Sequence, residues 1–199
     1  MNLSDAKIGD ILLSYGGAED NKPLNILHGQ IRGAQKAIGY REYGATHVQI
    51  RCCREGLWAS DEAEGVILHE PKIYSDRKYR LVRVKQELTH KGLLAMQAYI
   101  DSHKGDKYDR GQLASIGIAV VFAKWRFPAF LGRWLGKRFD GGGNYTVCSG
   151  LVYDALRAAG VVLPLPRLDP NRRNPGERAM PCLYEPANNP EYFELIAES

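Results

Sequence analysis

The sequence of 199 residues lacks two kinds of long run that would place it at once in a broad class of protein. Its most apolar stretch, residues 113–123, is about half as long as the roughly 20 apolar residues needed to cross a bilayer. Basic residues are interspersed with acidic ones, and the formal net charge is only +4. We therefore expect neither a transmembrane segment nor a nucleic-acid partner.

The N-terminus also lacks the positively charged start and apolar core of a secretory signal. This absence predicts a protein that is soluble and cytoplasmic where it is made. Delivery or secretion by a route that needs no signal is the alternative.

Only four cysteines occur, and they lack the spacing of a metal or redox motif. Cys52 and Cys53 are adjacent, while Cys148 and Cys182 stand alone. No Cys-x-x-Cys pair is present, which excludes a zinc ribbon and a thioredoxin motif. The pattern does not indicate a disulfide framework and favours synthesis in a reducing compartment.

What the sequence does contain is typical of a single soluble domain. Its content is 44% hydrophobic and 25% charged, and its length is enough for a substantial core. From about residue 164 the chain becomes rich in proline and arginine. We expect this C-terminal extension to be an irregular wrap over the surface, so that residues 1–199 form one domain.

Periodicity predicts a mixture of strands and helices. Alternating apolar residues predict strands at 8–13, 46–52, 66–69 and 79–85. A polar turn at 60–62 precedes the third of them. The connections are too short for crossover helices, so the sheet should be antiparallel. Helical patterns occupy about 24–38, 87–103, 111–124 and 148–159, with a flexible loop at 140–144. The predicted fold class is α+β.

Cys148 is the most informative residue, because it lies between a glycine-rich loop and an amphipathic helix. A cysteine in the first turn of a helix faces the positive end of the helix dipole and free backbone N–H groups, which favour its thiolate. The same N–H groups can receive an oxyanion. A buried, inert cysteine is the alternative for such a residue.

A nucleophilic cysteine needs a base, most often histidine, held by a third polar group. His47 begins one predicted strand and His69 ends another, so an antiparallel sheet could make them neighbours. One would accept the thiol proton while the other orients it. His28 lies in a glycine-rich segment and could contact substrate, and the remaining histidines fall on predicted helices.

Zinc binding is a different use of the same residues. Two imidazoles and a thiolate, from His47, His69 and Cys148, are good zinc ligands. The three residues include no closely spaced ligand pair, so the sequence favours thiol chemistry. That chemistry needs no metal and no organic cofactor.

The helix sequence YTVCSGLVYDALRAAG resembles the nucleophile helix of NlpC-type papain-like cysteine hydrolases. In the ordinary family the cysteine precedes the histidine, whereas here IGDILLS, THV, VILHEP and KYD all precede VCSGL. This order resembles the circularly permuted branch, which includes YiiX- and YebB-like bacterial proteins and the lecithin retinol acyltransferase group. The resemblance covers about residues 8–163, through short motifs, and implies a small antiparallel sheet packed against helices.

The resemblance also implies a role for individual residues. Cys148 takes the position of the nucleophile and His47 that of the base. The third position falls on His69, although a bulge near Pro71 could bring in Glu70 instead. Tyr108 and Asp109 match the Tyr-Asp pair that precedes the cysteine helix in this family, and the match implies that they line the cleft.

The implied reaction is acyl transfer, in which Cys148 attacks a carbonyl and its backbone N–H holds the oxyanion. The substrate could be a peptide or peptidoglycan fragment, which we favour, a lipid acyl group, or an isopeptide or thioester. Aromatic residues within 113–135 could wall a lipid groove or give a peripheral membrane contact, although a core helix followed by a surface loop is favoured. A papain-like binding module without turnover is the alternative outside enzymes.

Overall fold

The computed structural model describes residues 3–16, 22–37, 39–54, 56–62, 65–71, 73, 77–108, 145–146, 148–165 and 179–199. Several predictions from the sequence lie outside these ranges. They are the helix at 111–124, the apolar and aromatic segment 113–135, the loop at 140–144, and Asp109.

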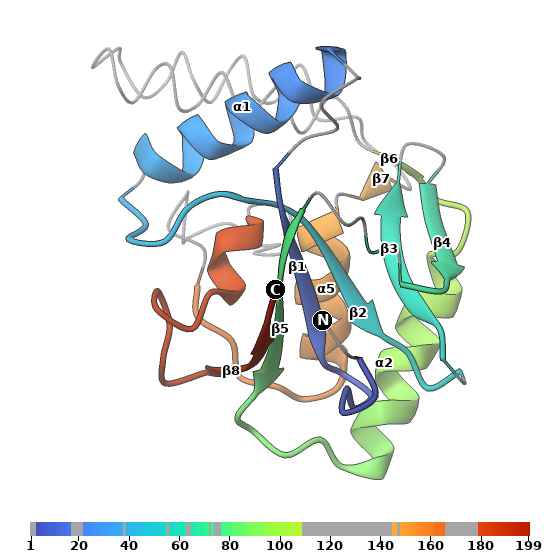
Figure 1. Cartoon of the computed structure of the whole chain (residues 1–199). Helices are drawn as coiled ribbons and strands as arrows, with labels where there is room; N and C mark the ends of the chain where they lie inside the picture. The colour runs from blue at the N-terminus through green and yellow to red at the C-terminus, as the bar shows by residue number, and fades with distance from the viewer. Residues whose placement is uncertain are drawn as a thin grey trace, which may run out of the picture.

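A six-stranded antiparallel sheet forms the centre of the fold, in the order β4-β3-β2-β1-β5-β8 (Figure 1). The strands are β1 (Ile11–Tyr15), β2 (Ala45–Arg51), β3 (Trp58–Glu62), β4 (Gly65–His69), β5 (Lys78–Val84) and β8 (Phe193–Glu198). Each of the five pairs of neighbouring strands runs antiparallel. The sheet therefore confirms the prediction of an antiparallel arrangement.

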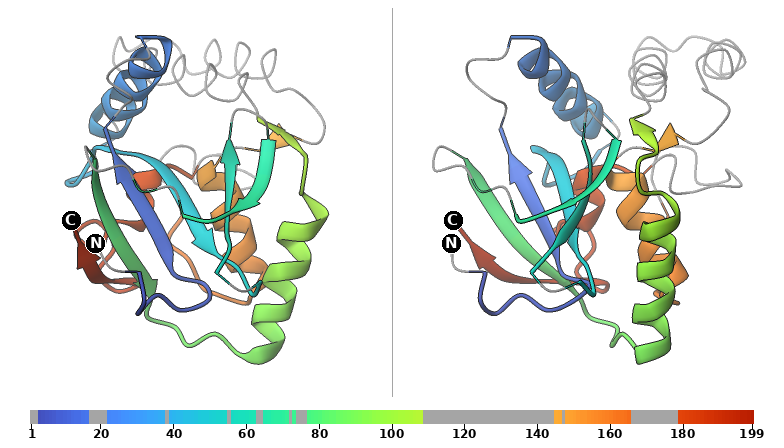
Figure 2. Two further views of the ribbon diagram at one scale, coloured as in Figure 1. Left: turned by 45° about the vertical axis from the view of Figure 1, so that its right-hand side comes forward. Right: turned by 90° about the vertical axis from the view of Figure 1, so that its right-hand side faces the viewer.

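In the described part of the chain, three α-helices accompany the sheet: α1 (Lys22–Ala37), α2 (His90–Ser102) and α5 (Cys148–Ala158). The α2 and α5 helices pack against each other and lie on the same face of the sheet (Figure 2). A short parallel pair, β6 (Lys107–Tyr108) and β7 (Tyr145–Thr146), leads into α5. These elements agree with the predicted α+β class and with the helices expected near 24–38, 87–103 and 148–159.

One predicted feature is wrong: Ser60 to Glu62 do not form a polar turn. They are the second half of β3, which pairs with β2 on one side and β4 on the other. Ser60 and Asp61 are both buried, so this strand places polar side chains where alternation of apolar residues is expected. Glu62 pairs with Gly65 at the start of β4, and the positive φ of Gly65, 107°, suits glycine.

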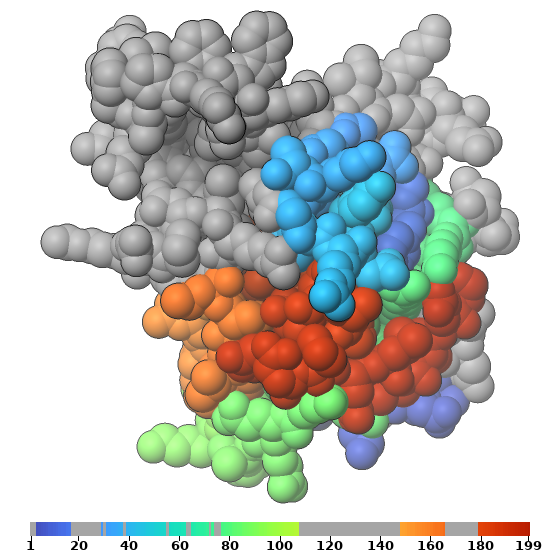
Figure 3. Space-filling model, turned by 90° about the vertical axis from the view of Figure 1, so that its left-hand side faces the viewer, coloured from blue at the N-terminus to red at the C-terminus, as the bar shows by residue number. Residues whose placement is uncertain are grey.

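The C-terminal segment is also less irregular than the sequence predicts. After a 3-10 helix, η2 (Pro181–Tyr184), the chain adds β8 to the edge of the sheet beside β5. All four residues of η2 are buried. Figure 3 shows residues 179–199 in red as one patch, bordered by residues 148–165 in orange and by α1 and the loop after it in blue. Over these residues the prediction of an irregular surface wrap is wrong.

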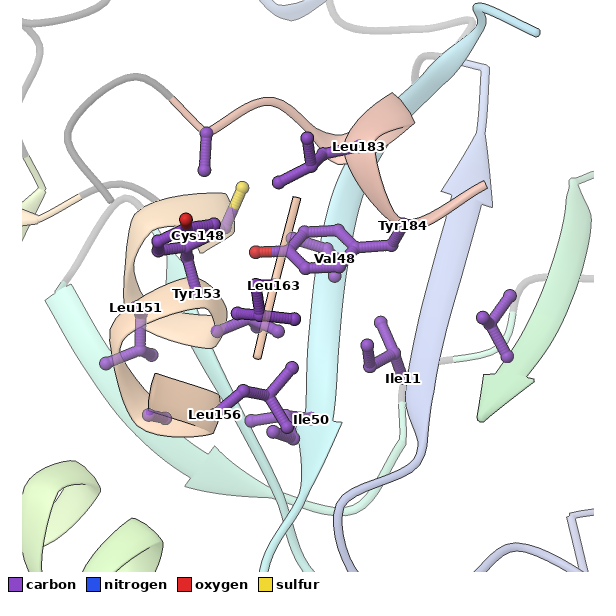
Figure 4. Packing of buried hydrophobic residues seen from close by; sticks show 14 of the residues in the cluster. Ile11, Val48, Ile50, Cys148, Leu151, Tyr153, Leu156, Leu163, Leu183 and Tyr184 are labelled. Carbon is purple, nitrogen blue, oxygen red and sulfur yellow. The ribbon is translucent and has the colours of Figure 1, made fainter. Parts of the chain in front are cut away.

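The main hydrophobic core lies between the sheet, α5 and η2 (Figure 4). Ile50 from β2 lies beside Leu156 from α5, and these two residues are fully buried, as are Val48 and Leu151. Apolar burial of this kind is worth about 25 cal/mol per Å². It fixes α5 against the centre of the sheet and so determines where the first residue of that helix lies.

Asp10 anchors the start of the sheet, which explains the Gly-Asp sequence ahead of β1. It is almost fully buried and accepts two hydrogen bonds from the Arg83 guanidinium, at 2.8 and 2.7 Å. It also accepts one from the Lys7 backbone N–H at 2.6 Å. The carboxylate therefore ties β5 to the turn before β1, and its role is structural.

Candidate active site

Cys148 is the first residue of α5, as the sequence predicts, and only 5% of it is exposed. The next residue fixes this end of the helix to the C-terminal segment. The Ser149 hydroxyl donates to the Ala179 carbonyl at 2.8 Å, and the Tyr184 hydroxyl donates to the Ser149 carbonyl at 2.6 Å. In Figure 4 the Cys148 sulfur lies at the end of the helix nearest Leu183. The first-turn N–H groups of a helix have no partner within it and can bind an anion.

His47 lies near the start of β2, at an irregularity in its pairing with β1. Ser14 pairs with His47 and Tyr15 with Ala45, so Thr46 is an extra residue at this point. The Thr46 hydroxyl donates to the Gly16 carbonyl at 2.8 Å, which holds the bulge. A β-bulge redirects the side chains beside it and is common next to functional sites. The His47 side chain is 22% exposed.

The electrostatics of His47 connect it to Cys148. Burial disfavours the charged ring and lowers its pKa, but the negative charge of Cys148 and a hydrogen bond with it act in the opposite direction. Glu62 adds to this effect, and the pKa of His47 rises to about 10. A cation gains stability from neighbouring negative groups, so the raised pKa favours a protonated His47 ring beside Cys148 and Glu62.

Glu62, at the end of β3, is the group next to the other side of His47. The His47 Nε2 atom lies 3.3 Å from Glu62 Oε1, a separation typical of an ion pair. The Nε2 atom is buried and its contact with Glu62 is not a well-aligned hydrogen bond. Catalytic contacts are often poorly aligned in the absence of substrate and tighten when it binds.

Sequence reasoning missed Glu62 because it assigned residues 60–62 to a turn. Extending the register of β2 and β3, in which Ile50 pairs with Ala59, places His47 opposite Glu62. The sequence signal that could have identified Glu62 is its place at the end of the five-residue segment that begins with Trp58. Recognising that signal requires the segment to be a strand, and its buried polar residues conceal the alternating pattern.

His69, at the end of β4, reaches the same carboxylate from the opposite side. Its Nε2 atom lies 3.8 Å from Glu62 Oε1 and 2.7 Å from the Ser60 hydroxyl oxygen. The Ser60 hydroxyl also donates to Glu62 Oε1 at 2.9 Å. His47 and His69 thus flank Glu62, and the described contacts of His69 are with β3 and its own chain neighbour.

The other predicted site residues have different positions. Glu70 is exposed, and its backbone carbonyl contacts His69 Nδ1. Tyr108 lies in β6 and pairs with Thr146, two residues before Cys148, so its backbone is beside the entry to α5. His28 lies in α1. The structure therefore brings together Cys148, His47 and Glu62, with His69 behind Glu62.

Removal of the Cys148 charge should lower the pKa of His47. The wild-type ring is expected to keep its proton to about pH 10. In Cys148→Ser the pKa should fall toward the ordinary 6.5, because burial then opposes the charge and only Glu62 supports it. NMR titration of the His47 ring measures this change. Cys53→Ser serves as the control, and equal His47 pKa values in the wild type and Cys148→Ser would contradict the pairing.

The other three cysteines are not arranged in this way. Burial raises the pKa of Cys52 to about 12, and burial also raises the pKa of Cys53. Cys182 is fully buried in η2, and none of the four cysteines forms a disulfide. A raised pKa suppresses thiolate formation, so Cys52 and Cys53 serve as internal references for Cys148.

Within the described ranges, no group of three or more His, Cys, Asp and Glu side chains is arranged to hold a metal ion. In the same part of the chain, none of the helices has the length and hydropathy of a membrane span. Comparison with known proteins adds nothing to this geometry: no family model, curated protein or solved structure matches the chain.

Proposed function

We propose that this protein is a thiol-dependent hydrolase or acyltransferase with Cys148 as nucleophile, His47 as base and Glu62 as the group that holds His47. The observation that supports it best is the position of His47, whose Nε2 lies 3.3 Å from Glu62 Oε1 and whose pKa is raised by Cys148 and Glu62 against the effect of burial. Thiol catalysis requires a nucleophile beside a base, and a third polar group that holds the base.

In the proposed reaction, His47 accepts the thiol proton and Cys148 attacks a carbonyl carbon. With Nε2 turned toward Glu62, Nδ1 is the ring nitrogen available for that proton. A carbon–sulfur bond forms, and the carbonyl oxygen becomes an oxyanion near the first-turn N–H groups of α5. His47 then gives its proton to the leaving group, whose bond to carbon breaks.

The second half of the reaction returns Cys148 to its starting state. Water, or another acceptor with a hydroxyl or amine, loses a proton to His47 and attacks the thioester carbonyl. The carbon–sulfur bond breaks, and the acyl group leaves as an acid or on the acceptor. Glu62 stays ionised throughout and stabilises the imidazolium each time it forms.

The papain-like, permuted NlpC type is the family we propose for this fold. Supporting it are the antiparallel sheet, the cysteine at the start of a helix that packs on β2, and the order of base, acid and nucleophile along the chain. This assignment makes the site Cys-His-Glu, with Glu62 in the third position that the sequence gives to His69 or Glu70.

A thiol-reactive fluorescent probe tests whether Cys148 is activated. At neutral pH, Cys148 should react faster than a model thiol and faster than Cys53, although Cys53 is the more exposed of the two. Peptide mapping by mass spectrometry identifies which cysteine carries the probe. Labelling of Cys148 no faster than the model thiol would contradict the catalytic proposal and favour a papain-like binding module.

A peptide amide, as in a peptidoglycan fragment, is the substrate class we propose first, and a lipid acyl group is the alternative. Incubation with peptidoglycan fragments and, separately, with phospholipids separates the two. Products are followed by mass spectrometry, with Cys148→Ser as the matched control. Products from neither class would reject both substrate proposals.

A further inference from the structure

We propose that His69 and Ser60 form a second, charged arm that holds Glu62 in place, so that the site is a chain of five groups. This inference rests on the proposed function, in which Glu62 stabilises His47. The five groups are Cys148, His47, Glu62, Ser60 and His69. The last two are positioning residues, because they act through Glu62 and do not touch the reacting atoms.

The number of hydrogens in this arm determines its charge. Ser60 has one hydroxyl hydrogen and two close neighbours, Glu62 Oε1 at 2.9 Å and His69 Nε2 at 2.7 Å. An ionised Glu62 can only accept, so it takes that hydrogen. His69 Nε2 must then be the donor in its contact with Ser60.

The other ring nitrogen of His69 leads to the same requirement. His69 Nδ1 contacts the backbone carbonyl of Glu70, and a carbonyl oxygen can only accept. Both ring nitrogens therefore carry hydrogen, and His69 is an imidazolium. It lies 3.8 Å from Glu62 Oε1, and its side chain is 13% exposed.

Glu62 consequently lies between two cationic rings, at 3.3 Å from His47 and 3.8 Å from His69. Its side chain is 28% exposed, so water alone screens it only in part. Two positive neighbours and one hydroxyl donor favour the ionised carboxylate and fix its direction. A fixed, ionised Glu62 then favours the charged form of His47.

Loss of the hydrogen on His69 Nε2 would reverse the direction of the hydrogen bond between Ser60 and His69. If His69 kept only the hydrogen on Nδ1, its Nε2 would accept, and the single Ser60 hydrogen would turn from Glu62 to His69. Glu62 would then lose both a hydrogen-bond donor and a positive neighbour. The state of His69 is thus transmitted to His47 through the orientation of one hydroxyl group.

Three measurements test this arm: the ring ¹⁵N shifts of His69, the pKa of His47 and the rate of probe labelling of Cys148. Ring ¹⁵N shifts should show both His69 nitrogens bearing hydrogen at neutral pH. Ser60→Ala should lower the pKa of His47 from about 10 and slow probe labelling of Cys148 by about tenfold. Residues that hold metal ligands in place through hydrogen bonds contribute at least about this factor, and Ser60 holds Glu62 in a comparable way. His69→Gln, which keeps an N–H donor without the charge, should have a smaller effect on labelling than His69→Leu.

The matched control is another serine and histidine pair on the surface. The Ser102 hydroxyl lies 3.1 Å from His103 Nδ1 at the end of α2, so Ser102→Ala removes a similar contact away from the site. An unprotonated His69 nitrogen, or Ser60→Ala values equal to those of Ser102→Ala, would overturn the inference. Slow labelling of wild-type Cys148 would instead reject the proposed function, while the ¹⁵N shifts still decide the state of His69.

Discussion

Replacing His47 with alanine is expected to reduce turnover by about 10²- to 10⁴-fold, the usual contribution of a positioned general acid–base group. The substitution removes the group that accepts the Cys148 proton and later protonates the leaving group. It also leaves Glu62 without the cation 3.3 Å away. Labelling of Cys148 by the thiol probe should slow in parallel, because the thiolate loses its counter-ion.

The control for this experiment is His90→Ala. His90 is an exposed residue at the start of α2 and has no described contact with the site. Circular dichroism of both variants checks that the fold is kept. Equal rates for His47→Ala and His90→Ala, with the fold retained, would show that Cys148 does not depend on His47.

The largest effect on stability is expected from Asp10→Ala, at about 3 kcal/mol of the free energy of unfolding. That value is the lower end of the range for removing one partner of a buried ion pair. The lower end applies because the Arg83 side chain is 22% exposed and can regain some water. The variant also leaves the Lys7 backbone N–H without its acceptor.

Urea unfolding followed by circular dichroism measures this loss, and Asp101→Ala is the matched control. Asp101 pairs with Arg54 at 3.1 Å, but both side chains are at least one third exposed. Exposed ion pairs contribute below about 1 kcal/mol, so this control should unfold close to the wild type. An Asp10→Ala midpoint equal to that of Asp101→Ala would contradict the structural role of the Gly-Asp sequence.

Two site residues could be located from the sequence because their signals are local. Cys148 precedes an apolar stripe at helical spacing that ends at Gly160, whose φ is 82°. His47 precedes the alternating residues of β2. Helix and strand periods are properties of a few consecutive side chains, so both placements follow without knowledge of the rest of the chain.

Glu62 could not be located in this way, because its role depends on which strands are neighbours. β3 buries Ser60 and Asp61 and therefore lacks the alternation that identifies a strand with one polar face. The buried Ser60 hydroxyl contacts Glu62 in its own strand and His69 from β4. His69 is brought to Ser60 by the register of β3 and β4, which the sequence pattern does not contain.

The C-terminal segment illustrates the same difference. Proline and arginine ahead of it suggest an irregular wrap, yet η2 is buried and β8 completes the sheet. The Tyr184 hydroxyl also reaches the Ser149 carbonyl, 35 residues away. A contact of that range is made by folding and leaves no local pattern.

The sequence by itself thus determined the α+β class, the helix that begins with Cys148 and the strand that carries His47. Only the tertiary structure decided that Glu62 is the group next to His47 and that His69 lies behind it. The reason is physical: side-chain period determines each element and the face it buries, whereas the pairing of β2, β3 and β4 determines which side chains meet.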